Sequence, residues 1–220
     1  MANELRATMA GAETAQTTLI DQLAGLTDDQ ARSPSLLPGW SVGHVLSHIA
    51  RNAQGQMRMI VAAGRGEVGV MYPGGREGRA ADIEAGAGRP AAELVDDVRV
   101  TADDLVRAWS QLDDEAWQRI GSTVNGDLPV SSVPLSRWRE VTVHHADLGP
   151  GVGAGYTWQV WPDEYVRLEL ARLTSLWATR KPMGLTTLPP AALAVSDHQR
   201  AAWLLGRTGI DGLPPAGLMG

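Results

Sequence analysis

The sequence predicts a mainly helical protein, and three observations support this prediction. Apolar residues recur three and four positions apart through several long segments, which is the spacing of an amphipathic helix. Strand signals are short, and no internal repeat indicates a solenoid. With 220 residues, of which 44% are hydrophobic, the chain is long enough to bury a large core in a main domain with a small appendage.

The helical segments follow one another along most of the chain. Ser41 and Pro90 are residues suited to begin a helix, and Gly64 and Gly149 are suited to follow its end. The pattern predicts helices over residues 4–26, 41–63, 76–84, 90–112, 136–149, 161–180 and 197–207.

The segments between these helices carry turn signals. Residues 27–40 contain two prolines and a glycine, so we expect an irregular connection there, and the glycine-rich residues 64–78 read as a surface loop. An Asn-Gly pair between two β-prone runs predicts a hairpin within residues 119–133. Residues 181–190 could hold one further strand.

Composition excludes several classes of function. The net charge is −6, and no basic block is present, which disfavours a nucleic-acid partner. No apolar run approaches the roughly 20 residues that span a bilayer, and the first residues lack the features of a signal peptide, so we expect a cytoplasmic protein. Cysteine is absent, so any thiol chemistry needs a thiol from a cofactor.

Two helical segments carry the residues that point to chemistry. Glu140 and His144 are four residues apart, so their side chains share one helical face, and His44 and His48 have the same spacing. A buried Glu-His hydrogen bond that only joins helices is the simpler interpretation of one such pair. Two pairs together favour a metal site. Two histidines and a glutamate are a ligand set that catalytic zinc sites use, with one position left open.

Three segments resemble the mycothiol-dependent maleylpyruvate isomerase family, within the DinB-like metal-binding superfamily. They are L-P-G-W-S-V-G-H-V-L-S-H-I-A-R-N-A at 37–53, V-M-Y-P at 70–73 and R-E-V-T-V-H-H-A-D-L-G at 139–149. The resemblance covers roughly residues 1–180. It implies a DinB-like up-down four-helix bundle over residues 1–155 with a metal in its core. A C-terminal helix and small α/β appendage over residues 156–220 would follow.

The resemblance also implies the ligands of the metal. They fall on His48, Glu140 and His144, with zinc favoured and nickel, iron or manganese as alternatives. His44 and His145 would then be neighbours of the ligands, with His44 as a fourth or alternative ligand. Asp147 would be an acceptor for the N–H of a ligand imidazole.

The activity that the resemblance implies fits the absence of cysteine. Zinc would bind the thiol of mycothiol and lower its pKa, and the thiolate would add to the cis double bond of maleylpyruvate. Rotation about the resulting single bond and elimination would give fumarylpyruvate. A dianionic substrate needs cations, for which Arg51, Arg139, Arg200 and Arg207 are candidates.

Other functions use the same residues. A mycothiol S-transferase would add the thiol to a small-molecule electrophile and stop, and a metal hydrolase would activate water instead. From another class, a non-catalytic metal-stabilised binding protein would use the His/Glu set only for structure. The protein is expected to be a monomer or a homodimer.

Overall fold

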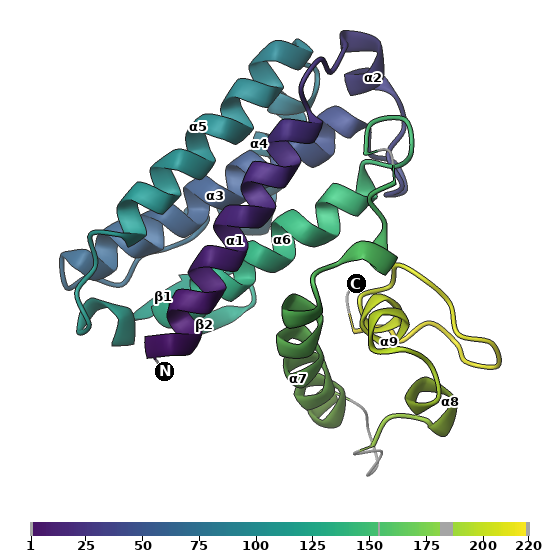
Figure 1. Cartoon of the computed structure of the whole chain (residues 1–220). Helices are drawn as coiled ribbons and strands as arrows, with labels where there is room; N and C mark the ends of the chain where they lie inside the picture. Colours follow the sequence, from purple (N-terminus) through teal and green to yellow (C-terminus); the bar gives the residue numbers. More distant parts are fainter. Residues whose placement is uncertain (1, 154, 181–186, 219–220) are drawn as a thin grey trace. The chain divides into compact units, whose positions relative to one another are not determined.

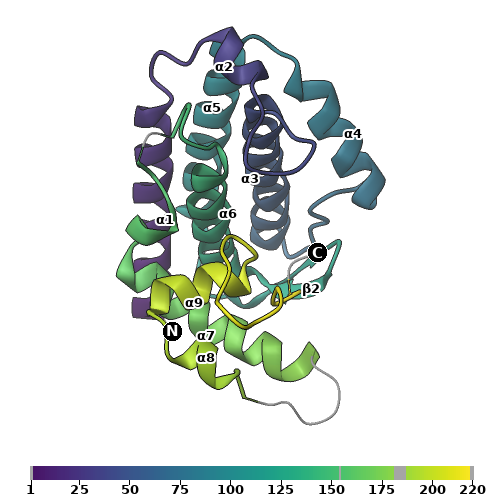
Figure 2. The ribbon, with the colours of Figure 1, turned by 90° about the vertical axis from the view of Figure 1, so that its right-hand side faces the viewer.

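Long helices packed side by side form the first of two units in the computed structural model, Met1–Gly155 and Tyr156–Gly220. The structure describes residues 2–153, 155–180 and 187–218. The bundle of the first unit consists of α1 (Ala2–Gln22), α3 (Val42–Gly64), α5 (Ala91–Trp109) and α6 (Val133–Asp147), as Figures 1 and 2 show. The mainly helical fold that the sequence predicts is confirmed.

The bundle helices run in two directions. The end of α3 lies beside the end of α5, since a Cβ added to Gly64 would lie 3.3 Å from Leu112 Cδ2, and Arg51 pairs with Asp97 earlier in both helices, so these two helices are parallel. His145 near the end of α6 hydrogen-bonds Gln22 at the end of α1, so this second pair is also parallel. Helix α4 (Gly75–Ala87) carries the chain back between α3 and α5, and it packs mainly on α3. Helices α3 and α6 are antiparallel, because His48 contacts His144 late in α6 while Gln56 contacts Ser136 early in it, so the order of directions is up, down, down, up.

Helix α4 approaches α3 very closely. A Cβ atom added to Gly43 would lie 2.2 Å from the carbonyl oxygen of Ala87, and one added to Gly86 would lie 2.3 Å from Ser47 Oγ. Real Cβ atoms do not approach other heavy atoms this closely, so only glycine fits at these two positions. The contact fixes the position of α4 beside the first turns of α3.

Short elements connect the bundle helices. Helix α2 (Asp28–Arg32) lies where the sequence predicts an irregular connection, and that prediction is wrong for these residues. The cause is a capping box, in which Thr27 and Gln30 bond each other's backbone N–H groups. The predicted hairpin is confirmed as β1 (Ile120–Thr123) paired antiparallel with β2 (Gly126–Pro129), between η1 (Ala116–Gln118) and η2 (Val130–Ser132).

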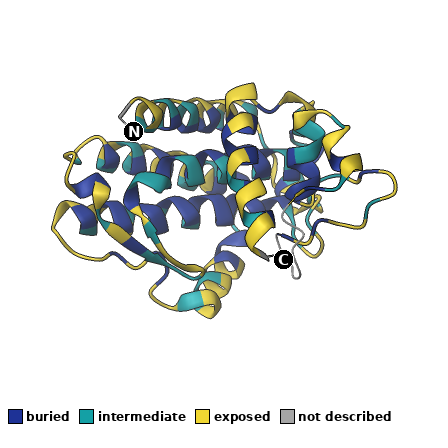
Figure 3. Ribbon diagram, turned by 90° about the horizontal axis from the view of Figure 1, so that it is seen from below, coloured by how far each residue is buried: buried dark blue, intermediate teal, exposed yellow. Residues whose placement is uncertain are grey.

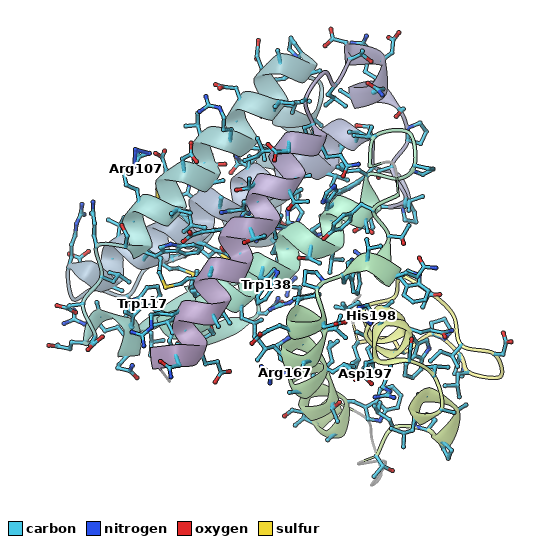
Figure 4. All side chains as sticks on the ribbon, in the orientation of Figure 1. Arg107, Trp117, Trp138, Arg167, Asp197 and His198 are labelled. Carbon is cyan, nitrogen blue, oxygen red and sulfur yellow. The ribbon has the colours of Figure 1, made fainter. Side chains whose placement is uncertain are left out.

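The core of the bundle lies between α1, α3, α5 and α6, whose facing sides are buried in Figure 3. Trp138 of α6, labelled in Figure 4, packs directly on Gly11 of α1, where a Cβ would lie 2.4 Å from its ring. The apolar stripe of α6 is buried at Trp138, Val141, Val143 and Leu148, with Val141 fully inaccessible. Burial of this stripe determines which face of α6 points to α3.

The second unit is also helical where the structure describes it. It contains η3 (Trp158–Val160), α7 (Asp163–Arg180), α8 (Pro190–Leu193) and α9 (Asp197–Leu204), and Trp177 packs on Trp203 with ring centroids 5.5 Å apart. The strand expected within residues 181–190 falls largely on residues 181–186, which lie outside the described residues. Across the described ranges, no helix has the length and apolarity needed to cross a membrane.

Two alanine substitutions test the close contact of α3 and α4. Gly43→Ala should lower the free energy of unfolding by about 1–3 kcal/mol, because the new methyl group collides with the backbone of Ala87. The matched control is Gly78→Ala on α4, where no described atom lies within 4 Å of the new Cβ; it should stabilise the protein by about 0.5–1 kcal/mol. Urea denaturation measures both, and equal effects would contradict the packing described.

Candidate metal centre

Helix α3 brings His48 into the core of the bundle. Ser41 caps this helix, since its side chain accepts the backbone N–H of His44 while His44 Nδ1 accepts the N–H of Ser41. His48 lies one turn further along, on a buried face that also carries Val45 and Asn52. Its side chain is only 4% exposed. The cap therefore determines where α3 begins, and His48 in its second turn lies in the interior.

Helix α6 supplies the two other groups. Pro134 in its first turn suits the start of a helix, and Glu140 and His144 follow on the face that points to α3. Their side chains are 21% and 15% exposed. Each side chain is therefore partly in contact with solvent.

The three side chains converge on one point. The distances between the nearest ligand atoms are 3.0 Å from His48 Nε2 to Glu140 Oε2, 3.1 Å from His48 Nε2 to His144 Nε2, and 3.6 Å from His144 Nε2 to Glu140 Oε2. Two ligand atoms that share one tetrahedral zinc ion, each about 2.1 Å from it, lie about 3.4 Å apart. The cluster therefore has the donor atoms and the dimensions that fit a divalent metal ion.

The outer nitrogens of the two histidines have different partners. His144 Nδ1 donates to Asp147 Oδ2 over 2.8 Å, so Asp147 is the acceptor that the sequence suggests, and the lone pair of His144 Nε2 faces the cluster. His48 Nδ1 lies 3.1 Å from Arg79 Nη2. An arginine can only donate, so His48 Nδ1 is an acceptor there.

The surroundings favour protonation states that suit a metal ligand set. Burial lowers the pKa of His48 to about 4, so its imidazole is neutral at physiological pH. Burial alone would raise the pKa of Glu140. The hydrogen bond from His48 instead holds that pKa well below its usual range, and the positive charge of Arg139 acts in the same direction. A neutral imidazole and an ionised carboxylate are the forms that bind metal.

The other histidines lie away from this cluster. His44 bonds Ser41 and, through Nε2, Glu84 of α4, so its ring is engaged outside the three-residue cluster. His145 is buried and bonds Gln22 of α1, and burial lowers its pKa to about 4. His198 belongs to the second unit, where it bonds the carbonyl of Trp161.

The arginines proposed from the sequence have separate surroundings. Arg51 donates to Asp97 of α5 over 2.5 Å, and Arg89 shares the same carboxylate. Arg139 lies next to Glu140 on α6 and contributes to lowering the pKa of that carboxyl. Arg207 belongs to the second unit and donates to the carbonyl of Leu205. Arg200, also in that unit, pairs with Asp197.

Arg79 and Tyr72 are functional candidates that the sequence reasoning missed. Arg79 contacts His48, and its guanidinium carbon lies 5.8 Å from the centre of the Tyr72 ring. Burial and the charge of Glu140 raise the pKa of Tyr72, so its hydroxyl stays protonated. The sequence contains one signal for Arg79: it lies four residues before the apolar Ile83, so the two side chains share one face of the helix. In the structure Ile83 is buried, so this face of α4 points inward.

A buried arginine lies beneath the cluster. Arg137 of α6 is fully inaccessible, and it donates to Gln16 of α1 over 2.7 Å and to the carbonyl of Ile49 of α3 over 2.8 Å. Burial lowers its pKa to about 10, and the charge of Glu140 acts in the opposite direction. Arg137 therefore stays a cation, which ties α1, α3 and α6 together and favours the ionised form of Glu140.

Comparisons with known proteins identify relatives of the chain. The family profile described as the mycothiol maleylpyruvate isomerase N-terminal domain matches residues 12–149. The crystal structure of a mycothiol-dependent maleylpyruvate isomerase matches with a TM-score of 0.81 and 24% identity, over 96% of this chain and 95% of that chain. A histidine-to-alanine mutant of such an isomerase matches with a TM-score of 0.82 and 22% identity, over the same shares. No curated protein sequence matches.

The buried histidines predict how stability depends on pH. His145 has a pKa of about 4 in the folded protein and 6.5 as its ordinary value, so the unfolded chain binds more protons between these values. The free energy of unfolding should fall as pH decreases from 6.5 to about 4, by up to about 3 kcal/mol from this residue.

In metal-free protein, His145→Gln should remove that share of the pH dependence, because glutamine does not titrate. Urea denaturation near pH 7 and near pH 5 gives the difference for wild type and variant. An unchanged difference in the variant would show that His145 is not buried in its neutral form.

Proposed function

Since the chain belongs to the mycothiol maleylpyruvate isomerase family, we propose that it is a divalent-metal enzyme that uses mycothiol as thiol cofactor. Its proposed substrate is maleylpyruvate or a similar small molecule with an activated cis double bond. The observation that carries this proposal is the cluster of His48, Glu140 and His144, in a chain that has no cysteine to supply a nucleophile.

His48, Glu140 and His144 would hold the metal ion, with zinc favoured by two imidazoles and one carboxylate. A divalent ion bound there would lower the pKa of a thiol, and such a thiol would add reversibly to the double bond so that the bond can rotate. Three protein ligands leave a coordination position for that thiol. The partial exposure of Glu140 and His144 provides the access that a cofactor and a substrate need.

The chain's own residues prepare this site. Asp147 fixes the ring of His144 with its Nε2 lone pair toward the cluster. Arg137 and Arg139 favour the carboxylate form of Glu140 by their charges. Buried apolar side chains on α3 and α6 surround His48 and limit the access of water from the core side, which strengthens electrostatic interactions at the cluster.

The metal content of the purified protein tests the ligand set. Wild type should contain about one zinc ion per chain, and His48→Ala and Glu140→Gln should each lose it, because either change removes one of three donors. The matched control is His44→Ala, one turn earlier on α3, which should retain the metal because His44 bonds Ser41 and Glu84 instead. Elemental analysis measures the content. Retention of zinc by Glu140→Gln would contradict the assignment, provided that circular dichroism shows folded protein.

The requirement for a thiol tests the reaction. The absorbance of maleylpyruvate should change only when zinc-loaded protein and mycothiol are both present, because the chain has no cysteine to replace the cofactor. Formation of fumarylpyruvate with the thiol recovered indicates an isomerase, whereas a stable thioether product indicates an S-transferase. Reaction in the absence of any thiol would exclude the proposed use of mycothiol.

A further inference from the structure

The hydrogen bonds of His48 assign the proton on its ring. Arg79 Nη2 lies 3.1 Å from His48 Nδ1, and a guanidinium has donors but no acceptor. Nδ1 must therefore accept, and the single proton of the neutral ring lies on Nε2, where it can be donated to Glu140 Oε2 over 3.0 Å. His144 is different, because its Nδ1 faces a carboxylate, which can only accept, so Nδ1 is the donor to Asp147.

This arrangement is incompatible with a metal ion on His48. A neutral imidazole that gives the lone pair of Nε2 to a metal carries its proton on Nδ1. The Nδ1–H group and the N–H of Arg79 would then be two donors facing each other, which cannot form a hydrogen bond. Binding of the metal through His48 therefore requires Arg79 to leave Nδ1.

A released Arg79 remains a cation beside the metal centre. Among the described residues, no carboxylate lies within ion-pair distance of Arg79, in contrast to Arg51, which pairs with Asp97. The side chain of Arg79 is half-buried on α4 and lies over the ring of Tyr72. A guanidinium in this position is suited to donate two hydrogen bonds to the oxygens of one carboxylate.

The hydroxyl of Tyr72 is the second polar group available at this place. Tyr72 is 7% exposed, and its hydroxyl lies near the side chains of Arg79 and Asn52, although among the described residues it makes no hydrogen bond of regular geometry. Gly55 of α3 leaves space for the residue before Tyr72, since a Cβ there would lie 2.8 Å from Met71 Cγ. The N–H groups of Arg79 can only donate to the hydroxyl, so a ligand oxygen that accepts a hydrogen bond from it would be favoured.

We propose that Arg79 and Tyr72 form the anion-binding side of the metal centre, and that loading of the metal releases Arg79 from His48 to bind a substrate carboxylate. The ligand class is a small cis-unsaturated carboxylic acid, with one carboxylate on Arg79 and an oxygen within reach of the Tyr72 hydroxyl. This inference rests on the proposed function, because it assigns a substrate contact to the same site.

Zinc affinity of the metal-free protein gives the first test. Arg79→Met should bind zinc about tenfold more tightly than wild type, because zinc no longer has to displace the Arg79–His48 hydrogen bond and a nearby positive charge is removed. The matched control is Arg76→Met, one turn earlier on α4, whose guanidinium bonds Asn125 of the hairpin instead; its zinc affinity should equal that of wild type. Calorimetric titration with zinc measures all three proteins. Weaker or unchanged zinc binding by Arg79→Met overturns the release of Arg79.

Maleate provides the second test, as a stable cis-dicarboxylate probe. In zinc-loaded protein, Arg79→Met should weaken maleate binding about tenfold, Tyr72→Phe should weaken it by a smaller factor, and Arg76→Met should leave it unchanged. Tyr72→Phe should bind zinc like wild type, because only a hydroxyl is removed. Unchanged maleate affinity in Arg79→Met overturns the anion-binding role. A wild-type protein that binds no zinc overturns the proposed function itself, which distinguishes the two failures.

Discussion

The largely covered charge of Glu140 between α3 and α6, whose side chain is 21% exposed, is the constraint on which the candidate centre depends. A carboxylate at this depth is costly unless hydrogen bonds and opposite charges compensate it. His48 crosses from α3 to make the shortest contact, His144 faces it from the next turn, and the buried Arg137 adds a positive charge below. This compensation requires one register of α6 against α3, so the same groups that suit a metal also align the helices.

Much of the candidate site could be predicted from the sequence, because it depends on the spacing of residues along single helices. The stripe on residues 136–149 determines which residues of α6 face inward, and a four-residue interval places Glu140 and His144 on one face. The segments that resemble a known family then point to His48. Contacts between residues far apart in the sequence could not be predicted in this way. Arg51 shares a helix with His48, but its partner Asp97 is 46 residues away. Arg79 was missed for the same reason.

His48 and His144 face the same cluster but have different hydrogen-bond partners in the metal-free protein. His144 is held by a carboxylate acceptor, and His48 by a guanidinium donor. The sequence indicated Asp147, which follows His144 by three residues on the same helix, but it did not indicate Arg79, which lies 31 residues from His48 on another helix. The difference matters for function, since one ring presents a lone pair and the other presents a proton to the same point.

The composition of α4, which covers His48 through Arg79, determines how the candidate metal centre can open. The helix has no side-chain cap at either end, it contains several glycines, and of its side chains mainly Ile83 and Ala87 are buried. Helices with few caps and little buried apolar area unfold locally at low cost in free energy. A transient opening of α4 would uncover His48 while α3 and α6 keep the three donor atoms together. Such a local opening would let ligands exchange without global unfolding of the bundle.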